Sequence, residues 1–303
     1  MSYLLKGALL GLSLSFTACT GQFQVVRLNN APEYNMVESQ ENLRKITIAH
    51  LNAADLRGNT PNIFEYISKE EALVRAKWLA DFLVKENVDI ITLNEVDYAG
   101  TAKTGGLDQP KIIAEFMGQP YNYVMFDQYL KSPLWTTGNA MISRFPMRTI
   151  YRHLYEGDLD SRLGQFFKDF IHGEIKVGKR ELEVITLHFD DEKGSYDFRR
   201  KEQARELHQY VIDYHHQHPN SFIVVPGDYN DAHDSQIMKT ILAGGVLHPP
   251  AENFGLNTYQ NGNLSADIDH VLATSNIAIN DYHTFNFPWS DHLGLLCELE
   301  FLE

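Results

Sequence analysis

Polar side chains with catalytic potential recur where apolar, strand-like runs of the chain begin or end. Carboxylate and amide oxygens suit a hard divalent cation such as Mg²⁺, and histidines beside carboxylates suit proton transfer. Any one of these residues alone would be read as a turn former or a solvated side chain. Together they predict metal-assisted hydrolysis of a phosphate ester. The residues are Asn52, Glu95, His188, Asp228, Asn230, Asp269, Asp291 and His292.

The elements that would position these residues alternate between strand-like and helical patterns. Residues 45–51 alternate polar and apolar side chains, which is typical of a half-buried strand. Leu73, Ala76 and Leu79 recur at helical spacing within residues 70–87. Gly178-Lys179 separates two strand-like runs and predicts a hairpin. Further strands are expected at 88–93, 221–226, 268–273 and 293–302, with a helix at 200–216. The mixture predicts two packed sheets with helices outside.

Other clusters of polar residues have structural explanations. His215, His216 and His218 close the second helix, where cationic side chains suit the helix dipole. A basic stretch at the start of that helix is interpreted as a solvated face, with a substrate-phosphate contact as the alternative; it comprises Arg199, Arg200, Lys201 and Arg205. The chain has no GxxxxGK[ST] loop and no G-x-S-x-G elbow, which argues against a P-loop enzyme and a serine hydrolase.

Composition excludes several classes of protein. The chain has 303 residues, with 44% apolar and 22% charged side chains, and its formal net charge is −14. This profile is that of a folded globular protein, and an acidic chain does not attract polyanions by its overall field. Cys19 and Cys297 are the only cysteines, so a disulfide framework or a cysteine-rich zinc site is excluded. We expect Cys297, within an apolar run, to be a buried small side chain.

The N-terminal residues have the pattern of an export signal. Lys6 precedes an apolar stretch over 7–16, and small residues lead into Cys19. The exit resembles a bacterial lipobox, in which the cysteine is lipidated and becomes the mature N-terminus. We therefore expect a signal peptide at 1–18, a tether at 19–44 and one catalytic domain at 45–303. Thr20 follows the cysteine, which by resemblance directs a lipoprotein to the bacterial outer membrane.

Short sequence motifs resemble one known family in composition and in order. The matching segments are HLNAADL around Asn52, DIITLNEVD around Glu95, GNAMISRFPM at 138–147, VITLHFD at His188, RKEQARELH at 200–208, VVPGDYND at Asp228, ADIDHVLA at Asp269 and WSDHLGL at Asp291. They resemble the endonuclease/exonuclease/phosphatase superfamily, which includes secreted deoxyribonucleases, neutral sphingomyelinases and inositol-polyphosphate 5-phosphatases. The departures are small; Asn94, for example, stands where Gln is usual.

The resemblance implies an α/β four-layer sandwich of two facing mixed β-sheets flanked by helices. It implies that Glu95, Asn52 and Asp291 hold Mg²⁺, with Mn²⁺ as a substitute. It assigns proton transfer or phosphoryl stabilisation to His292, polarised by Asp269. Asp228 would orient or deprotonate the water, and Asn230 and His188 would contact the phosphate. Whether Asp228 or His292 is the base stays open at this point.

Three functions compete for this set of residues. The first is a secreted or surface-anchored phosphoesterase acting on a small or lipid-derived phosphate ester, as a monomer. The second is a secreted nuclease on the same scaffold, for which the sequence shows no basic run interleaved with aromatic residues. The third is a non-catalytic binding protein, which the presence of the full catalytic set disfavours.

Overall fold

The computed structural model describes residues 24–27, 42–58, 66–98, 100–131, 136–155, 168–191 and 197–302. The expected signal peptide at 1–18, Cys19 and most of the tether lie outside these residues. None of the helices in the described part of the chain has the length and apolar character that a membrane crossing requires.

The first sheet has seven strands in the order β1-β4-β5-β3-β2-β15-β14. Its neighbouring strands are antiparallel except β2 and β3, which run parallel with Asn52 opposite Asn94. Its strands are β1 (Gln24–Arg27), β2 (Lys45–Asn52), β3 (Ile90–Val96), β4 (Tyr123–Lys131), β5 (Thr136–Ser143), β14 (Ile277–Asn286) and β15 (Leu293–Phe301).

The second sheet has six strands in the order β10-β13-β9-β8-β7-β6. Here β8 and β9 form the parallel pair, with His188 opposite Asp228. Its strands are β6 (Met147–Leu154), β7 (Asp169–Val177), β8 (Arg180–His188), β9 (Phe222–Asp228), β10 (Leu247–His248) and β13 (Asp269–Thr274). A small separate hairpin consists of β11 (Tyr259–Asn261) and β12 (Leu264–Ala266).

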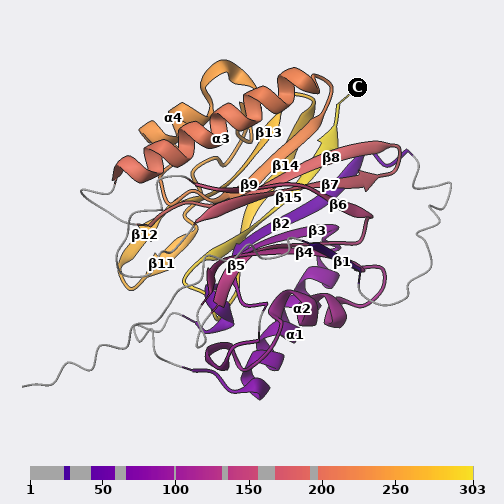
Figure 1. The fold of residues 1–303 in the computed structure, drawn as a ribbon, viewed down its shortest axis with the longest axis vertical. Helices are drawn as coiled ribbons and strands as arrows, with labels where there is room; N and C mark the ends of the chain where they lie inside the picture. Colours follow the sequence, from indigo (N-terminus) through magenta and orange to yellow (C-terminus); the bar gives the residue numbers. More distant parts are fainter. Residues whose placement is uncertain are drawn as a thin grey trace, which may run out of the picture.

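Helices cover the outer faces of the two sheets (Figure 1). The helices α1 (Lys69–Lys85) and α2 (Gln109–Met117) pack on the first sheet, and α3 (Asp197–Gln217) and α4 (Gln236–Ile241) pack on the second. Three apolar clusters separate the layers: one under α1 and α2, one between the sheets, and one under α3 and α4. Cys297 lies in the middle cluster, as expected for a buried small side chain. The predicted four-layer α/β sandwich is confirmed.

The predicted elements are present with shifted ends. The helix expected at 70–87 begins after Ser68, which forms a capping box with Glu71. It stops before Asn87, whose φ of 53° is left-handed. The strand expected at 88–93 begins two residues later and continues to Val96, through an irregularity in its pairing with β5. The predicted hairpin is β7 and β8, with Gly178 in the turn at a φ of 61°.

A chain of buried polar side chains crosses between the two sheets. The Asn94 Oδ1 atom accepts the backbone N–H of Asp228 at 3.1 Å, and its Nδ2 donates to Asn139 Oδ1 at 2.6 Å. The Asn139 Nδ2 atom donates in turn to Asp169 Oδ1 at 2.6 Å. Asn94 and Asn139 belong to the first sheet, whereas Asp228 and Asp169 belong to the second. Asn94, the departure from the family pattern, therefore serves the contact between the sheets.

Candidate active site

The predicted site residues gather where the two parallel strand pairs end. Asn52 and Glu95 lie at the carboxyl ends of β2 and β3, and His188 and Asp228 end β8 and β9. These ends lie around one pocket of about 320 Å³. The predicted residues that line it are Asn52, Glu95, His188, Asp228, Asn230, Asp291 and His292. Asp269 lies behind His292 and contacts it from the side of β13.

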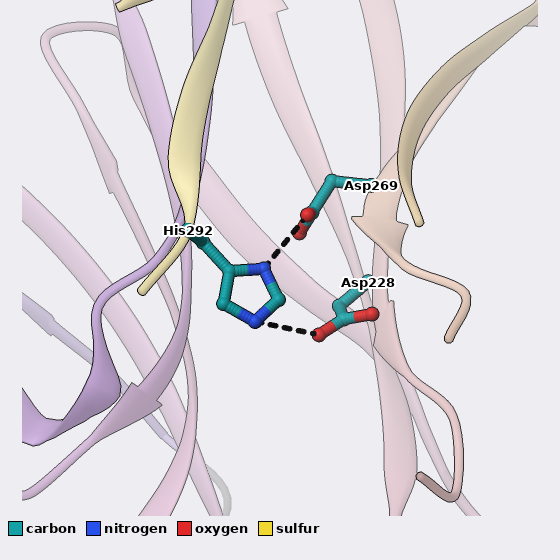
Figure 2. A group of neighbouring side chains, drawn as sticks. All are labelled: Asp228, Asp269 and His292. Carbon is teal, nitrogen blue, oxygen red and sulfur yellow. Dashed lines mark hydrogen bonds and ion pairs between the residues drawn. The ribbon is translucent and has the colours of Figure 1, made fainter. Parts of the chain in front are cut away.

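His292 points between two carboxylates (Figure 2). Its Nδ1 lies 2.8 Å from Asp269 Oδ2, and its Nε2 lies 3.8 Å from Asp228 Oδ2. The two carboxylates are neighbours because Asp269 pairs with Asp228 across β13 and β9. Thr258 Oγ1 accepts the backbone N–H of Asp269 at 3.0 Å, which fixes the start of β13. All three side chains of Figure 2 are buried.

Burial and mutual charge set the protonation of these groups. Burial alone would lower the pKa of His292, but the Asp269 carboxylate outweighs it and raises that pKa to about 10. Burial would raise the pKa of Asp269, yet the adjacent His292 ring holds it well below its usual range. Burial, together with the Asp269 charge, raises the pKa of Asp228 to about 7. The Asp269 carboxylate therefore favours a protonated His292, and burial beside that carboxylate brings the pKa of Asp228 close to neutral pH.

Two asparagines orient Asp228 from opposite sides. Asn52 Nδ2 donates to Asp228 Oδ2 at 2.9 Å, and the backbone N–H of Asn230 donates to Oδ1 at 2.9 Å. Asn230 has a left-handed φ of 49°, a conformation that costs energy and is often kept at functional sites. Its side-chain amide donates to the Phe189 carbonyl at 3.0 Å. Asn230 thus lines the pocket and also shapes the loop that holds Asp228.

Glu95 has a strained backbone and a partly exposed carboxylate. Its φ is 50°, and it lies where the pairing of β3 with β5 is irregular. Its side chain is 33% exposed, and Oε1 lies 3.8 Å from His188 Nε2. Behind it lies Asp55, which the sequence analysis did not single out; burial and the Glu95 charge raise the pKa of Asp55 to about 7. The negative charge of Glu95 thus raises the pKa of a buried carboxyl group beside it, that of Asp55.

His188 has a buried lysine beside it, and no sequence pattern pointed to that lysine. Lys168 Nζ lies 2.8 Å from His188 Nε2 and 3.2 Å from Nδ1. His188 Nε2 is also 3.5 Å from Asp228 Oδ2. Burial and the Lys168 charge hold the pKa of His188 well below its ordinary value. His188 is therefore neutral, in contrast to His292.

Two pocket residues besides the predicted ones have chemistry suited to a substrate. Arg200 lines the pocket with its side chain only 9% exposed, and Nη1 donates to the Asn230 carbonyl at 2.7 Å. A solvated face is therefore wrong for Arg200, although it holds for Arg205, whose side chain is 61% exposed. Tyr259 also lines the pocket and contacts the His292 ring edge-on, with centroids 5.1 Å apart. Within the described part of the chain, Arg200 is the only arginine or lysine that lines the pocket.

The pocket offers the hard oxygen donors that Mg²⁺ requires. Glu95, Asn52 and Asp291 all line it and match the ligand chemistry of that cation. A different set, Asp228, Asp269 and His292, places ligand atoms within 4.8 Å of one another and could also hold an ion. An imidazolium has no lone pair to offer a cation, so the protonation of His292 favours proton chemistry at that cluster. Among the described residues no such cluster includes His215, His216 or His218.

Comparison with solved structures finds the same fold in several proteins. An endonuclease/exonuclease/phosphatase from Beutenbergia cavernae is 20% identical, with a TM-score of 0.67 over 86% of this chain and 72% of that one. The human Nocturnin catalytic domain, with a bound sulfate anion, is 15% identical, with a TM-score of 0.61 over 92% and 98%. A mannosyl-6-phosphatase from Bacteroides thetaiotaomicron is 16% identical, with a TM-score of 0.58 over 84% and 100%.

The sequence comparisons agree with the fold. No curated protein matches the chain. A family profile matches residues 67–292, a span that includes Glu95, His188, Asp228, Asp269 and His292. The chain belongs to the Endonuclease/Exonuclease/phosphatase family.

Proposed function

We propose that the protein is a divalent-metal-dependent phosphoesterase that hydrolyses a phosphodiester or phosphomonoester bond. One observation carries this proposal: the Asp269–His292 pair faces Asp228 in the same pocket that Glu95 lines. Phosphate ester hydrolysis needs a water activated by a base and positive charge to stabilise the phosphoryl oxygens. In this pocket Asp228 can serve as the base, His292 can supply the positive charge and Glu95 can hold a cation.

The pKa values of Asp228 and His292 support an assignment of the two roles that the sequence left open. We assign the base to Asp228, because a base works best when its pKa lies near the operating pH and that of Asp228 is about 7. Since His292 is already protonated, it donates a hydrogen bond from Nε2 to a phosphoryl oxygen or gives a proton to the leaving group. Asp269 keeps Nδ1 protonated and fixes the ring. Asn52 and Asn230 hold the Asp228 carboxylate in place for the water.

Mg²⁺ would be held by Glu95, with Asn52 and Asp291 nearby, and Mn²⁺ would substitute for it. When bound, the cation supplies Lewis-acid stabilisation of charge on the phosphate. The Glu95 carboxylate would be accessible to the cation, because its side chain is 33% exposed. His188 and Arg200 also line the pocket and would contact the phosphate of the substrate.

The substrate class that the pocket favours is a small or lipid-derived phosphate ester. A volume of about 320 Å³ is at the lower end of the range for small-molecule sites. Among the described residues that line the pocket, the acidic ones outnumber the one arginine, whereas a nuclease needs an extended basic surface; these acidic residues are Glu95, Asp191, Asp228 and Asp291. A protein of the same fold is a mannosyl-6-phosphatase, so the fold is compatible with a phosphomonoesterase.

We propose that the enzyme works at a membrane surface as a monomer, exported and lipid-anchored through Cys19 to the bacterial outer membrane. The support is the sequence pattern of residues 1–19. Expressed with its signal, the wild type should enter the detergent phase of a membrane extract, and Cys19→Ser should move it to the aqueous phase. Equal partitioning of the two proteins would rule out the anchor.

The decisive experiment is a panel assay of the purified domain with Mg²⁺, with EDTA, and with EDTA followed by Mn²⁺. The panel holds plasmid DNA, sphingomyelin, an inositol phosphate, p-nitrophenyl phosphate and bis-p-nitrophenyl phosphate. We expect turnover of a small or lipid-derived ester, abolished by EDTA and restored by metal. Preferential cleavage of DNA would make the protein a nuclease, and inactivity on every substrate would favour the binding-protein alternative.

The matched variants are Glu95→Gln in the pocket and Glu70→Gln on the exposed first turn of α1. Both remove one negative charge at almost constant volume. Glu95→Gln should need far more metal for the same activity or never recover, because a neutral amide attracts Mg²⁺ less strongly. Glu70→Gln should match the wild type. Unchanged metal dependence in folded Glu95→Gln would remove Glu95 from the metal site.

A further inference from the structure

The strand β1 lies at the edge of the first sheet, level with the end of β3 that carries Glu95. One row of paired residues crosses four strands of this sheet, in the order Gln24, Phe126, Ala140 and Leu93. Leu93 is two residues before Glu95. Neighbouring strands lie about 4.8 Å apart, so three spacings, or about 14 Å, separate Gln24 from β3.

The direction of β1 follows from the same pairings. Because β1 is antiparallel to β4, β4 to β5 and β5 to β3, β1 runs opposite to β3. Since β3 runs toward the pocket, the N-terminal end of β1 points to the pocket end of the sheet. Only residues 20–23 separate Cys19 from Gln24. A fully extended chain spans at most about 3.6 Å per residue, so Cys19 lies within about 18 Å of Gln24.

Two exposed apolar side chains lie at the same end of the molecule. Leu264 is 67% exposed near the turn of the β11–β12 hairpin (Figure 1), whose residues Tyr259 and Ala266 line the pocket. Phe198 is 53% exposed in the first turn of α3, two residues before Arg200, which also lines the pocket. Single exposed apolar residues are normal on protein surfaces. The position of these two, at the end where β1 begins, makes a lipid surface their partner.

We infer that the membrane that holds Cys19 also docks the pocket end of the domain, so that the pocket faces the lipid surface. Leu264 and Phe198 enter the interface, where buried apolar area adds to binding. The substrate is then the phosphate ester of a lipid headgroup in the same membrane. The orientation rests on the proposed lipid anchor, and the substrate rests on the proposed phosphoesterase activity.

Energy transfer from single labelled sites to the membrane measures the orientation without any substrate. The purified lipoprotein is placed in phospholipid vesicles whose headgroups carry an acceptor. The donor is attached to Asn263→Cys, in the turn of the hairpin, or to Lys179→Cys, in the β7–β8 turn. Lipidated Cys19 and buried Cys297 do not react with the label.

We expect stronger transfer from position 263 than from position 179. The nine residues of β8 place the β7–β8 turn about 30 Å from the pocket end, at about 3.3 Å per residue. Leu264→Ser should reduce the difference between the two positions. Val74→Ser, at a 63% exposed residue of α1, is the matched control and should leave it unchanged. Equal transfer from the two positions, or stronger transfer from position 179, would overturn the inference.

A longer tether tests the substrate. A flexible Gly-Ser insertion of about 20 residues after Gly21 keeps Cys19 but loosens the link to β1. Effective concentration falls roughly as the −3/2 power of linker length, so turnover of a lipid phosphate ester in the same vesicle should fall about 10-fold. Turnover of a water-soluble ester should not change. Equal rates of both proteins on the vesicle ester would overturn the substrate assignment.

Failure of the earlier proposals gives different results. If the wild type does not stay on the vesicles, the anchor is refuted and this orientation with it. If the protein binds the vesicles but turns over no ester, the proposed function and the substrate assignment fail, while the energy-transfer comparison still decides the orientation.

Discussion

Two buried histidine–carboxylate pairs in this protein have the same contact distance and different surroundings. His292 Nδ1 lies 2.8 Å from Asp269, and His172 Nε2 lies 2.8 Å from Glu183. The second nitrogen of His172, Nδ1, lies 2.6 Å from the hydroxyl of Tyr210 in α3. Both nitrogens of this ring therefore contact protein groups. The second nitrogen of His292 instead faces Asp228 across 3.8 Å in the pocket.

The difference shows that a histidine–carboxylate pair does not by itself mark an active site. In the His172 pair both ring nitrogens have protein partners, which join β7, β8 and α3, so the pair contributes to folding. In the His292 pair one N–H is directed at a volume large enough for a phosphate ester. Catalytic capacity therefore depends on what the outer nitrogen faces, and the variants below test that distinction.

The largest effect is expected from His292→Ala. Losing a positioned proton donor should lower turnover by roughly 10²–10⁴, measured on the substrate found in the panel with circular dichroism as the check on folding. His216→Ala, at an exposed histidine of α3, should change little. A greater loss from His216→Ala than from His292→Ala would contradict the site assignment.

Asp269→Asn should lower turnover less than His292→Ala does. The His292 ring remains in this variant, but its orientation is less fixed and its positive charge is less stabilised. We expect turnover to fall about 10- to 100-fold, as for other partners that orient a functional histidine. The matched change in the other pair, Glu183→Gln, should leave turnover per folded molecule unaltered. Equal losses in the two variants would mean that the comparison between the pairs is mistaken.

The pH profile should change in a defined direction. In the wild type, activity should rise through about pH 7 as Asp228 loses its proton and fall through about pH 10 as His292 loses its own. The Asp269 charge raises both pKa values, so Asp269→Asn should move both limbs to lower pH. The rate–pH profile of kcat/KM in the two proteins measures this, and a shift in the opposite direction would refute the electrostatic account.

The smallest effect on turnover is expected from His172→Ala. The substitution removes the hydrogen-bond partner of Glu183 Oε2 and of the Tyr210 hydroxyl, which should lower the free energy of unfolding by about 1–3 kcal/mol. Denaturant unfolding should reveal that loss, while turnover per folded molecule stays at the wild-type value. Loss of turnover with unchanged stability would indicate that His172 takes part in the chemistry.

The site residues at strand ends could be predicted from the sequence. The buried residues that contact them from behind could not. Asp228 and His292 stand out because short motifs surround them. Lys168 has no such signal, and Asp55 lies within the HLNAADL motif but was not singled out, since burial beside a site residue depends on contacts made across the fold. Arg200 was found within a basic stretch, yet residue types along a helix do not reveal which arginine turns toward a pocket.

The fold could be predicted in its layers and in part of its strands. The helical spacing of apolar residues in α1 and the alternation of polar and apolar residues in β2 are local patterns. They can therefore be recognised in the sequence alone. By contrast, β4, β6 and β14 mix buried and partly exposed residues without a clean alternation. The strand β5 is buried along its whole length and includes short polar residues, so its sequence has no alternation to reveal it. The bulge at Glu95 was also invisible, since a left-handed φ at a glutamate is imposed by tertiary contacts.

The polar chain through Asn94 and Asn139 has a mechanical consequence. The apolar contacts between the sheets give no directional restraint of their own, because the hydrophobic effect depends on the area removed from water. Hydrogen bonds of 2.6–3.1 Å between buried amides and carboxylates lose their geometry under a small lateral shift. The two sheets are therefore pinned against shear at the end where the pocket lies. On heating, we expect the two sheets to separate first at the end away from the pocket. The distance between Glu95 and Asp228 should then be among the last to change.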